Sequence, residues 1–194
     1  MKMKQFRHLY FPADLQTRDQ TESEDPIIEG YFAVTEAETE LWEGVFEEIA
    51  TGAFDNSLKN NDIRCLFNHQ TDVVLGRMSA GTLELRIDEK GLYGKATINP
   101  NDSEAMNVYQ RVKRGDISNC SFGFYPKDEQ IINRDDGTVK FIVKEADTME
   151  VSVVTFPAYP QTEVEARQKE MELSQKRAAE VWKSKMKGRM KKWH

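Results

Sequence analysis

Short segments rich in β-branched and aromatic residues alternate with turn-forming residues through most of the chain. This pattern predicts strands separated by tight turns. In one segment, Leu83, Leu85 and Ile87 alternate with polar residues, which is typical of a half-buried strand. The predicted strands are Gly30–Val34, Ile63–Phe67, Thr82–Ile87, Leu92–Ile98, Cys120–Tyr125, Val139–Val143 and Met149–Phe156.

Helical periodicity is clearest in Ser103–Arg114, where apolar residues recur at positions i, i+3, i+4 and i+7. Residues 101–103 supply N-cap candidates, and Gly115 suits the position after the last helical residue. A short helix is also expected over Ala53–Lys59. A third helix is expected over much of Glu163–Arg189, which contains no proline and one late glycine.

Turn signals join these elements and divide the chain. Asp88–Gly91 and Asp135–Gly137 are each typical of a hairpin turn. About seven strands with few helices predict a mainly β fold of the α+β class, a closed or partly closed β-barrel or a sandwich. Pro157 and Pro160 mark a boundary, because proline cannot continue a central strand. The expected divisions are an N-terminal strand with a polar acidic loop (1–26), a central domain (27–162) and a basic helical tail (163–194).

Composition narrows the class of protein. The chain has 194 residues, enough to bury a substantial core. It is 39% hydrophobic and 31% charged, and no apolar run approaches the roughly 20 residues that a membrane-spanning helix needs. The basic N-terminus lacks the apolar segment of a secretory signal, so none is expected. Cys65 and Cys120 are too few for a disulfide scaffold or a zinc site, and they are expected to be free thiols in a reducing cytoplasm.

Charge is unevenly distributed along the chain. Residues 163–194 contain ten Lys or Arg and five acidic residues, so this tail carries +5. The net charge of −6 therefore combines the basic tail with a body, residues 1–162, of −11. An acidic body argues against a nucleic-acid-binding domain, which needs clustered Lys and Arg for phosphate contacts. The tail is interpreted either as a solvated helix or as a segment that docks on a protein or a membrane surface.

The candidate chemistry starts from His69, because His8 belongs to the N-terminal segment and His194 is the last residue. His69 follows a predicted strand, in CLFNHQTD, at a position where loops often carry function. No second histidine lies three or four residues away, so no metal site is expected. Taken alone, His69 is better explained as an ordinary structural or surface histidine.

Two neighbouring residues are candidate nucleophiles for a base at His69. Ser121 lies in NCSFGFYP, where Gly123 lets another group approach the backbone closely. The Cys120 thiol is intrinsically the stronger nucleophile, but it shares its strand face with two phenylalanines that are expected in the core. This alternation favours Ser121, on the open face, although an ordinary strand serine fits the pattern too.

A third group would have to orient the imidazole. Glu150 lies in a predicted strand whose other face carries Met149, Val151 and Val153. A carboxylate inside such a strand needs a partner if it is buried. The alternative interpretation is an exposed glutamate on the solvent face of an edge strand.

Six blocks of sequence follow one another in a specific order and spacing. They are EGYFAV (29–34), GAFDNSL (52–58), CLFNHQTDVVLGRM (65–78), GLYGKATI (91–98), NCSFGFYP (119–126) and MEVSVVTFPAYPQTEV (149–164). In this order they resemble the prohead proteases of tailed bacteriophages, the HK-ninety-seven-type capsid maturation proteases. The resemblance covers roughly residues 27–164.

The resemblance implies a serine endopeptidase with the fold of herpesvirus assemblins, a β-barrel surrounded by helices. It implies His69 as general base, Ser121 as nucleophile and Glu150 as the third member of a triad, with Glu145 and Asp147 as alternative acids. The implied substrates are the scaffold region of the phage major capsid protein and the protease itself. The implied location is the assembling prohead in the host-cell cytoplasm, a setting compatible with self-association. No cofactor, nucleic acid or membrane is expected as a partner.

Two other classes of function stay open. A non-enzymatic capsid scaffold or assembly protein on the same fold would leave His69 and Ser121 as structural residues. Hydrogen-bond reach between the two side chains would favour the protease. A nucleic-acid-binding module acting through the tail would bind with steep salt dependence. Within the protease hypothesis, Arg77 and Arg114 are conceivable helpers of the backbone N–H groups that stabilise the oxyanion.

Overall fold

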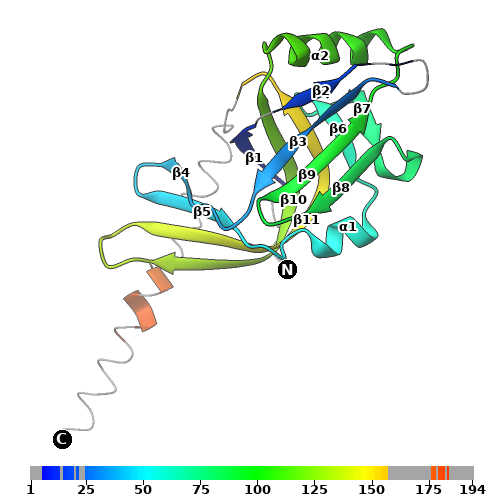
Figure 1. Ribbon diagram of the computed structural model, residues 1–194. Coiled ribbons are helices and arrows are strands. Elements are labelled where there is room, and N and C mark those ends of the chain that lie inside the picture. The colour runs from blue at the N-terminus through cyan, green and yellow to red at the C-terminus, as the bar shows by residue number, and fades with distance from the viewer. Residues whose placement is uncertain are drawn as a thin grey trace, which may run out of the picture.

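The computed structural model describes residues 6–13, 15–19, 21, 25–156 and six residues between 176 and 183. Within this part, no helix is long and apolar enough to cross a membrane. The elements, shown in Figure 1, are β1 (Arg7–Pro12), β2 (Gln16–Arg18), β3 (Ile27–Val34), β4 (Thr39–Trp42), β5 (Val45–Ile49), α1 (Asp55–Asn60), β6 (Arg64–Phe67), β7 (Gln70–Arg77), a 3-10 turn (Met78–Ala80), β8 (Leu83–Ile87), β9 (Gly91–Thr97), α2 (Ser103–Arg114), β10 (Asn119–Asn133) and β11 (Val139–Val154).

The strands form two sheets around one long hairpin. β10 and β11 pair in antiparallel fashion at the centre of a seven-stranded sheet that has the order β1-β10-β11-β5-β4. β5 and β6 both pair in parallel with β11, along 139–143 and 150–153, and β7 pairs with β6. The second sheet has four strands in the order β2-β3-β9-β8. These observations confirm the mainly β class.

The sheets do not close into a barrel, so that part of the prediction is wrong. Among the described strands, β1, β4 and β7 end the larger sheet, and β2 and β8 end the smaller one. The pattern of apolar residues predicts which segments are extended, but closure of a barrel depends on how distant sheet edges pair.

The buried core contains side chains of both sheets, among them Phe32 and Leu92 from the smaller sheet and Phe122 and Val151 from the larger.

Helix α2 has the bounds and the caps that its sequence predicts. The Asp102 side chain accepts hydrogen bonds from the backbone N–H groups of Glu104 and Ala105 at 3.0 and 3.1 Å. Gly115 follows the helix with a φ of 86°, a left-handed conformation that glycine adopts without strain. The predicted apolar stripe is buried in the core. The short helix α1 is also confirmed, with its ends shifted by one or two residues.

Both predicted hairpin turns are confirmed, but β10 and β11, which flank the second turn, are longer than expected. Turns at 88–91 and 135–137 connect β8 to β9 and β10 to β11. The segments predicted as 139–143 and 149–156 belong to one continuous strand, β11, that is 16 residues long. β2 occupies residues 16–18, within the N-terminal segment (1–26) for which the sequence predicted one strand and a polar acidic loop.

The ends of β10 and β11 that lie beside their connecting turn form an arm together with β4 and β5. This arm extends away from the rest of the fold (Figure 1). A separate small apolar cluster supports this arm: Val45, Val139 and Phe141 are buried, and Trp42 and Ile131 pack against them. The arm therefore has its own contacts and does not depend on the main core for all of its packing.

The predicted helical tail falls mostly outside the described residues, as do Pro157 and Pro160. The described positions 176, 177, 179–181 and 183 are helical. The division of the chain at 162 stays a prediction.

Candidate active site

The register of three strands brings the candidate residues to one face of the larger sheet. Ser121 on β10 lies opposite Ser152 on β11 and Tyr10 on β1. Two positions along, Gly123 lies opposite Glu150 on β11 and His8 on β1. Directly opposed residues in a sheet point to the same face, so these six positions share a face. The neighbouring positions point to the other face and fill the core.

Cys120 lies on the core face, as predicted. It is fully buried beside Phe122 and Phe124 in the main apolar cluster. Burial raises the pKa of the Cys120 thiol well above its usual range, so it stays a neutral thiol. Ser121 lies on the opposite face, but its side chain is fully buried and not open to solvent as the sequence suggested.

A tight turn between β6 and β7 presents His69. Asn68 and His69 have φ angles of 49° and 61°, a left-handed conformation that is uncommon for residues other than glycine. The Asn68 backbone N–H donates to the carbonyl of Val153 at 3.0 Å. Its side-chain oxygen accepts a hydrogen bond from the backbone N–H of Thr155 at 2.9 Å. The end of β11 therefore fixes the turn, and the local strain lies at a candidate catalytic position.

Glu150 is the acid that contacts the imidazole. Its Oε1 lies 2.8 Å from Nδ1 of His69, and its side chain is almost buried. Ser152 donates a hydrogen bond of 2.6 Å to Oε2 of the same carboxylate. A neutral imidazole donates from one nitrogen only, so this contact directs the His69 proton to Nδ1 and leaves Nε2 as the acceptor.

The alternative acids and Arg77 form hydrogen bonds or ion pairs with residues outside the candidate site. Glu145 accepts a hydrogen bond from Asn56, and Asp147 forms an ion pair with Lys127 at 2.7 Å. Arg77 donates to Asp62 at 2.7 Å. Among the described residues, neither arginine proposed as a helper contacts His69, Ser121 or Glu150.

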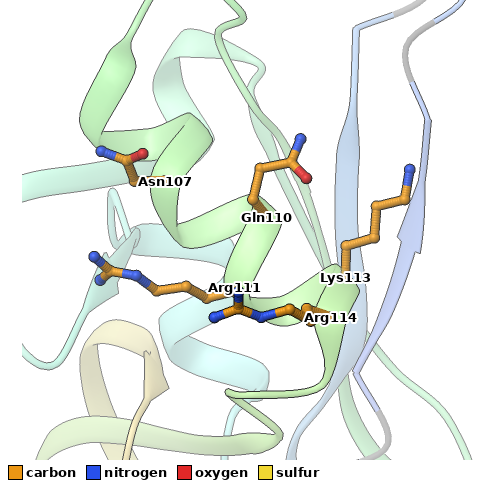
Figure 2. Close-up of a pocket in the computed structure, with 5 residues that line it drawn as sticks. All are labelled: Asn107, Gln110, Arg111, Lys113 and Arg114. Carbon is orange, nitrogen blue, oxygen red and sulfur yellow. The ribbon is translucent and has the colours of Figure 1, made fainter.

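Arg114 lies on the outward side of α2, in a shallow basic hollow (Figure 2). Its guanidinium donates to Asp116, which lies two residues beyond the end of the helix. The hollow is lined by Asn107, Gln110, Arg111, Lys113 and Arg114. None of the three proposed triad residues lines it, so Arg114 belongs to a different surface from the candidate site.

Gly123 explains how a carboxylate fits at the centre of this face. A Cβ atom at this position would lie 2.3 Å from Oε1 of Glu150 and 2.6 Å from Cζ of Phe6. The sequence predicted that Gly123 lets another group approach the backbone, and the Glu150 carboxylate is that group. The missing side chain therefore makes room for the acid that contacts His69.

Two buried polar atoms at the site have no hydrogen-bond partner among the described residues: Oγ of Ser121 and Nε2 of His69. The direct Ser121–His69 hydrogen bond that the protease hypothesis expects is therefore not formed in this structure. Hydrogen bonds between catalytic groups are often long or misaligned without substrate. Unpaired buried polar groups are rare in proteins, and a catalytic role is one of the reasons for them.

Sequence reasoning missed His8, which it assigned to the N-terminal segment. β1 pairs with β10 and brings the His8 ring to a centroid distance of 3.9 Å from the His69 ring. Nε2 of His8 lies 3.6 Å from Oε1 of Glu150. One ligand atom from each of these three residues lies within 4.8 Å of the others. The sequence test for a metal site considered only neighbours in the chain and could not detect this group.

Comparison with known proteins identifies the family of this chain. The sequence profile described as the caudovirus prohead serine protease matches residues 13–177. The chain belongs to this family. The matched range includes His69, Ser121 and Glu150, but begins after His8.

One sequence relative and one solved structure are similar to this member of the prohead protease family. The chain is 31% identical over 150 residues to the prohead protease of Enterobacteria phage HK97. This alignment covers 72% of the chain and 59% of the phage HK97 protein, so the chain spans less than two thirds of that relative. The solved structure of the bacteriophage T4 capsid assembly protease shares the fold, with a TM-score of 0.56 at 12% identity. That likeness covers 79% of this chain and 98% of the T4 chain.

Proposed function

We propose that this chain is a serine endopeptidase of phage capsid maturation in which Ser121, His69 and Glu150 act as nucleophile, general base and orienting acid. One observation carries the proposal. Glu150 fixes the His69 tautomer through Nδ1, while Nε2 and the Ser121 hydroxyl are both buried without a partner. Nε2 of His69 is an acceptor without a donor, and the Ser121 hydroxyl is a donor without an acceptor. Each group can therefore supply the hydrogen-bond partner that the other lacks.

The reaction follows from the roles of these groups. As Ser121 Oγ attacks the carbonyl carbon of the scissile peptide, Nε2 of His69 takes the hydroxyl proton. The imidazolium formed is stabilised by the carboxylate of Glu150. His69 then gives this proton to the leaving amine as the peptide bond breaks, which leaves an acyl ester on Ser121. A water molecule activated by His69 hydrolyses the ester and restores the hydroxyl.

Ser152 is the second serine on this face, and it is better suited to a supporting role. Its hydroxyl already donates to Oε2 of Glu150 at 2.6 Å, so its proton is directed at the carboxylate and not at His69. Ser121 has no such competing bond. This difference favours Ser121 as the nucleophile and Ser152 as a residue that positions Glu150.

Family membership supports a proposal for the substrate class. The two relatives are called a prohead protease and a capsid assembly protease. We therefore propose that the substrate is the scaffold region of the major capsid protein, together with this chain itself. The reaction would take place in the assembling prohead inside the host cell. Self-association there would raise the local concentration of protease and cleavage sites.

The test is coexpression of the full chain with a candidate major capsid protein, analysed by intact mass. We expect cleavage of the capsid protein by the wild type, and none by Ser121→Ala. Ser118→Ala is the matched control, because Ser118 is an exposed serine three residues earlier in the chain. We expect this control to cleave like the wild type.

Labelling with a fluorophosphonate, which modifies activated serines, identifies the nucleophile independently of the substrate. Peptide mapping should locate the adduct at Ser121. An adduct at Ser152, or full cleavage by Ser121→Ala, would overturn the assignment. A folded wild-type chain that neither cleaves nor is labelled would favour the scaffold function.

A further inference from the structure

The group formed by His8, His69 and Glu150 combines donors from three separate strands or turns. His8 comes from β1, His69 from the turn after β6, and Glu150 from β11. Nε2 of His8 and Nδ1 of His69 lie 3.6 and 2.8 Å from the same carboxylate oxygen. The proposed peptidase reaction uses His69 and Glu150, but it gives no role to His8.

We propose that these three residues bind Zn²⁺ and that the bound ion inhibits the peptidase. Two imidazoles and one carboxylate form a ligand set that suits zinc, which takes nitrogen and oxygen ligands at about 2.0–2.2 Å. In a tetrahedral site with these bond lengths, ligand atoms lie roughly 3.3 Å apart. The three ligand atoms already lie within 4.8 Å of one another, so side-chain adjustments alone bring them to this geometry.

The surroundings of the group favour a divalent cation. Ser152 holds the second oxygen of Glu150, which orients the carboxylate as outer hydrogen bonds orient metal ligands. The side chains of His8 and His69 are 20% and 17% exposed, whereas that of Glu150 is 8% exposed. An ion can therefore enter from the histidine side and meet a nearly buried negative charge. Nitrogen donors also favour zinc over Mg²⁺ and Ca²⁺, which prefer oxygen ligands.

Inhibition follows from the position of the imidazole proton. When Zn²⁺ binds Nδ1 of His69, it replaces the hydrogen bond between Nδ1 and Glu150. A neutral imidazole keeps one proton, which must then be on Nε2. Nε2 becomes a donor and can no longer accept the Ser121 proton. No bond to substrate is made or broken in this step, and removal of the ion restores the original tautomer.

The experiment measures binding separately from catalysis, because only the inhibition rests on the proposed function. The full chain, without a histidine tag and with Ser121→Ala to prevent self-cleavage, is titrated with ZnCl₂ by calorimetry. We expect one Zn²⁺ per chain. In the same background, His8→Ala should weaken binding by at least roughly tenfold, because a ligand is lost.

His194→Ala is the matched control, because it removes the third histidine of the chain without changing the group. We expect it to bind like the parent. His8→Gln is the second variant, and circular dichroism verifies that both His8 variants are folded. Absence of binding by the parent, or equal affinity in the His8 and His194 variants, would overturn the proposed site.

Activity measurements then test the consequence. Zn²⁺ should inhibit wild-type cleavage, EDTA should reverse the inhibition, and Mg²⁺ at the same concentration should have no effect. Relative to its own zinc-free rate, His8→Ala should need at least roughly tenfold more Zn²⁺ for half inhibition. Activation by Zn²⁺ would overturn the inhibitory role while leaving the binding result intact. A peptidase-inactive chain that still binds Zn²⁺ through His8 would contradict the proposed function and not the site.

Discussion

The carboxylate of Glu150 occupies the space that a side chain on Gly123 would need. The two residues lie opposite each other on β10 and β11, and a Cβ atom on Gly123 would lie 2.3 Å from Oε1 of Glu150. Real Cβ atoms essentially never approach another atom so closely. The orientation of the acid toward His69 therefore depends on the absence of a side chain one strand away.

The first prediction concerns Gly123→Ala. The added methyl group pushes the Glu150 carboxylate away from Nδ1 of His69, and overpacking of this kind costs about 1–3 kcal/mol. We expect the chain to fold with a lower Tm and to lose about 100-fold in kcat/KM, because small displacements of catalytic groups have effects of this size. Cleavage of a capsid-derived peptide and thermal unfolding measure the two effects.

Gly52→Ala is the control for this prediction. A Cβ atom there would meet only Oδ2 of Asp55, at an ordinary 3.8 Å. We expect wild-type activity from this variant. Wild-type activity of Gly123→Ala as well would show that the Glu150 position is not critical for cleavage.

The second prediction concerns Ser152. Removal of its hydroxyl deletes a hydrogen bond to a charged group, an interaction of about 1.5–3 kcal/mol. In Ser152→Ala we expect a fall in kcat of roughly 10- to 100-fold with little change in KM, because the acid is positioned less well while substrate contacts remain. Ser152→Thr keeps a hydroxyl and should recover part of the rate. Steady-state kinetics with one peptide substrate compare the variants, and complete loss of fluorophosphonate labelling in Ser152→Ala would instead indicate a nucleophile.

The third prediction concerns the turn that carries His69. In Asn68→Ala, the hydrogen bonds to Thr155 are lost, and alanine is strained at a φ of 49°. We expect a loss of about 1–2 kcal/mol, or roughly 2–8 °C in Tm, together with lower activity. Asn68→Gly tolerates the backbone conformation but lacks the side-chain bonds, so its Tm should lie between those of Asn68→Ala and the wild type. A Tm for Asn68→Gly below that of Asn68→Ala would contradict the strain argument.

Local signals in the sequence predicted the local parts of the fold. The caps and apolar stripe of α2 are contained in about a dozen consecutive residues, and the structure has the predicted bounds. The same holds for the hairpin turns, where short polar segments separate neighbouring strands. Strand alternation also placed Cys120 in the core and Ser121 on the other face. In each case the determining contacts lie close together in the chain.

Features that depend on distant pairing were not predictable in this way. His8 reaches the site only because β1 pairs with β10, whose register sets His8 opposite Gly123, more than 100 residues later. The pattern of one strand carries no information about which edge it will meet. The open form of the two sheets has the same origin. The contact of Glu150 with His69, 81 residues earlier, was accessible through family resemblance and not through periodicity.

The last prediction concerns the thiol beside the proposed nucleophile. Desolvation raises the pKa of Cys120 well above its usual range, so almost no thiolate forms in the folded chain at pH 8. Burial raises the pKa of Cys65 as well. We therefore expect both thiols to resist Ellman's reagent in the native state and to react fully in urea. Cys120→Ala should retain cleavage within roughly twofold, despite some loss of stability from a smaller core residue.

The raised pKa of Cys120 also predicts how the stability of the folded chain depends on pH. The folded chain holds the Cys120 proton more tightly than the unfolded chain, in which a cysteine has a pKa of about 8.5. Stability is therefore unaffected well below pH 8.5, and it falls as the pH rises above that value, because only the unfolded thiol ionises readily. Urea unfolding between pH 7 and 10 should show a smaller alkaline loss of stability in Cys120→Ala than in the wild type. A folded but inactive Cys120→Ala would instead make the thiol the nucleophile, and the choice of Ser121 would be wrong.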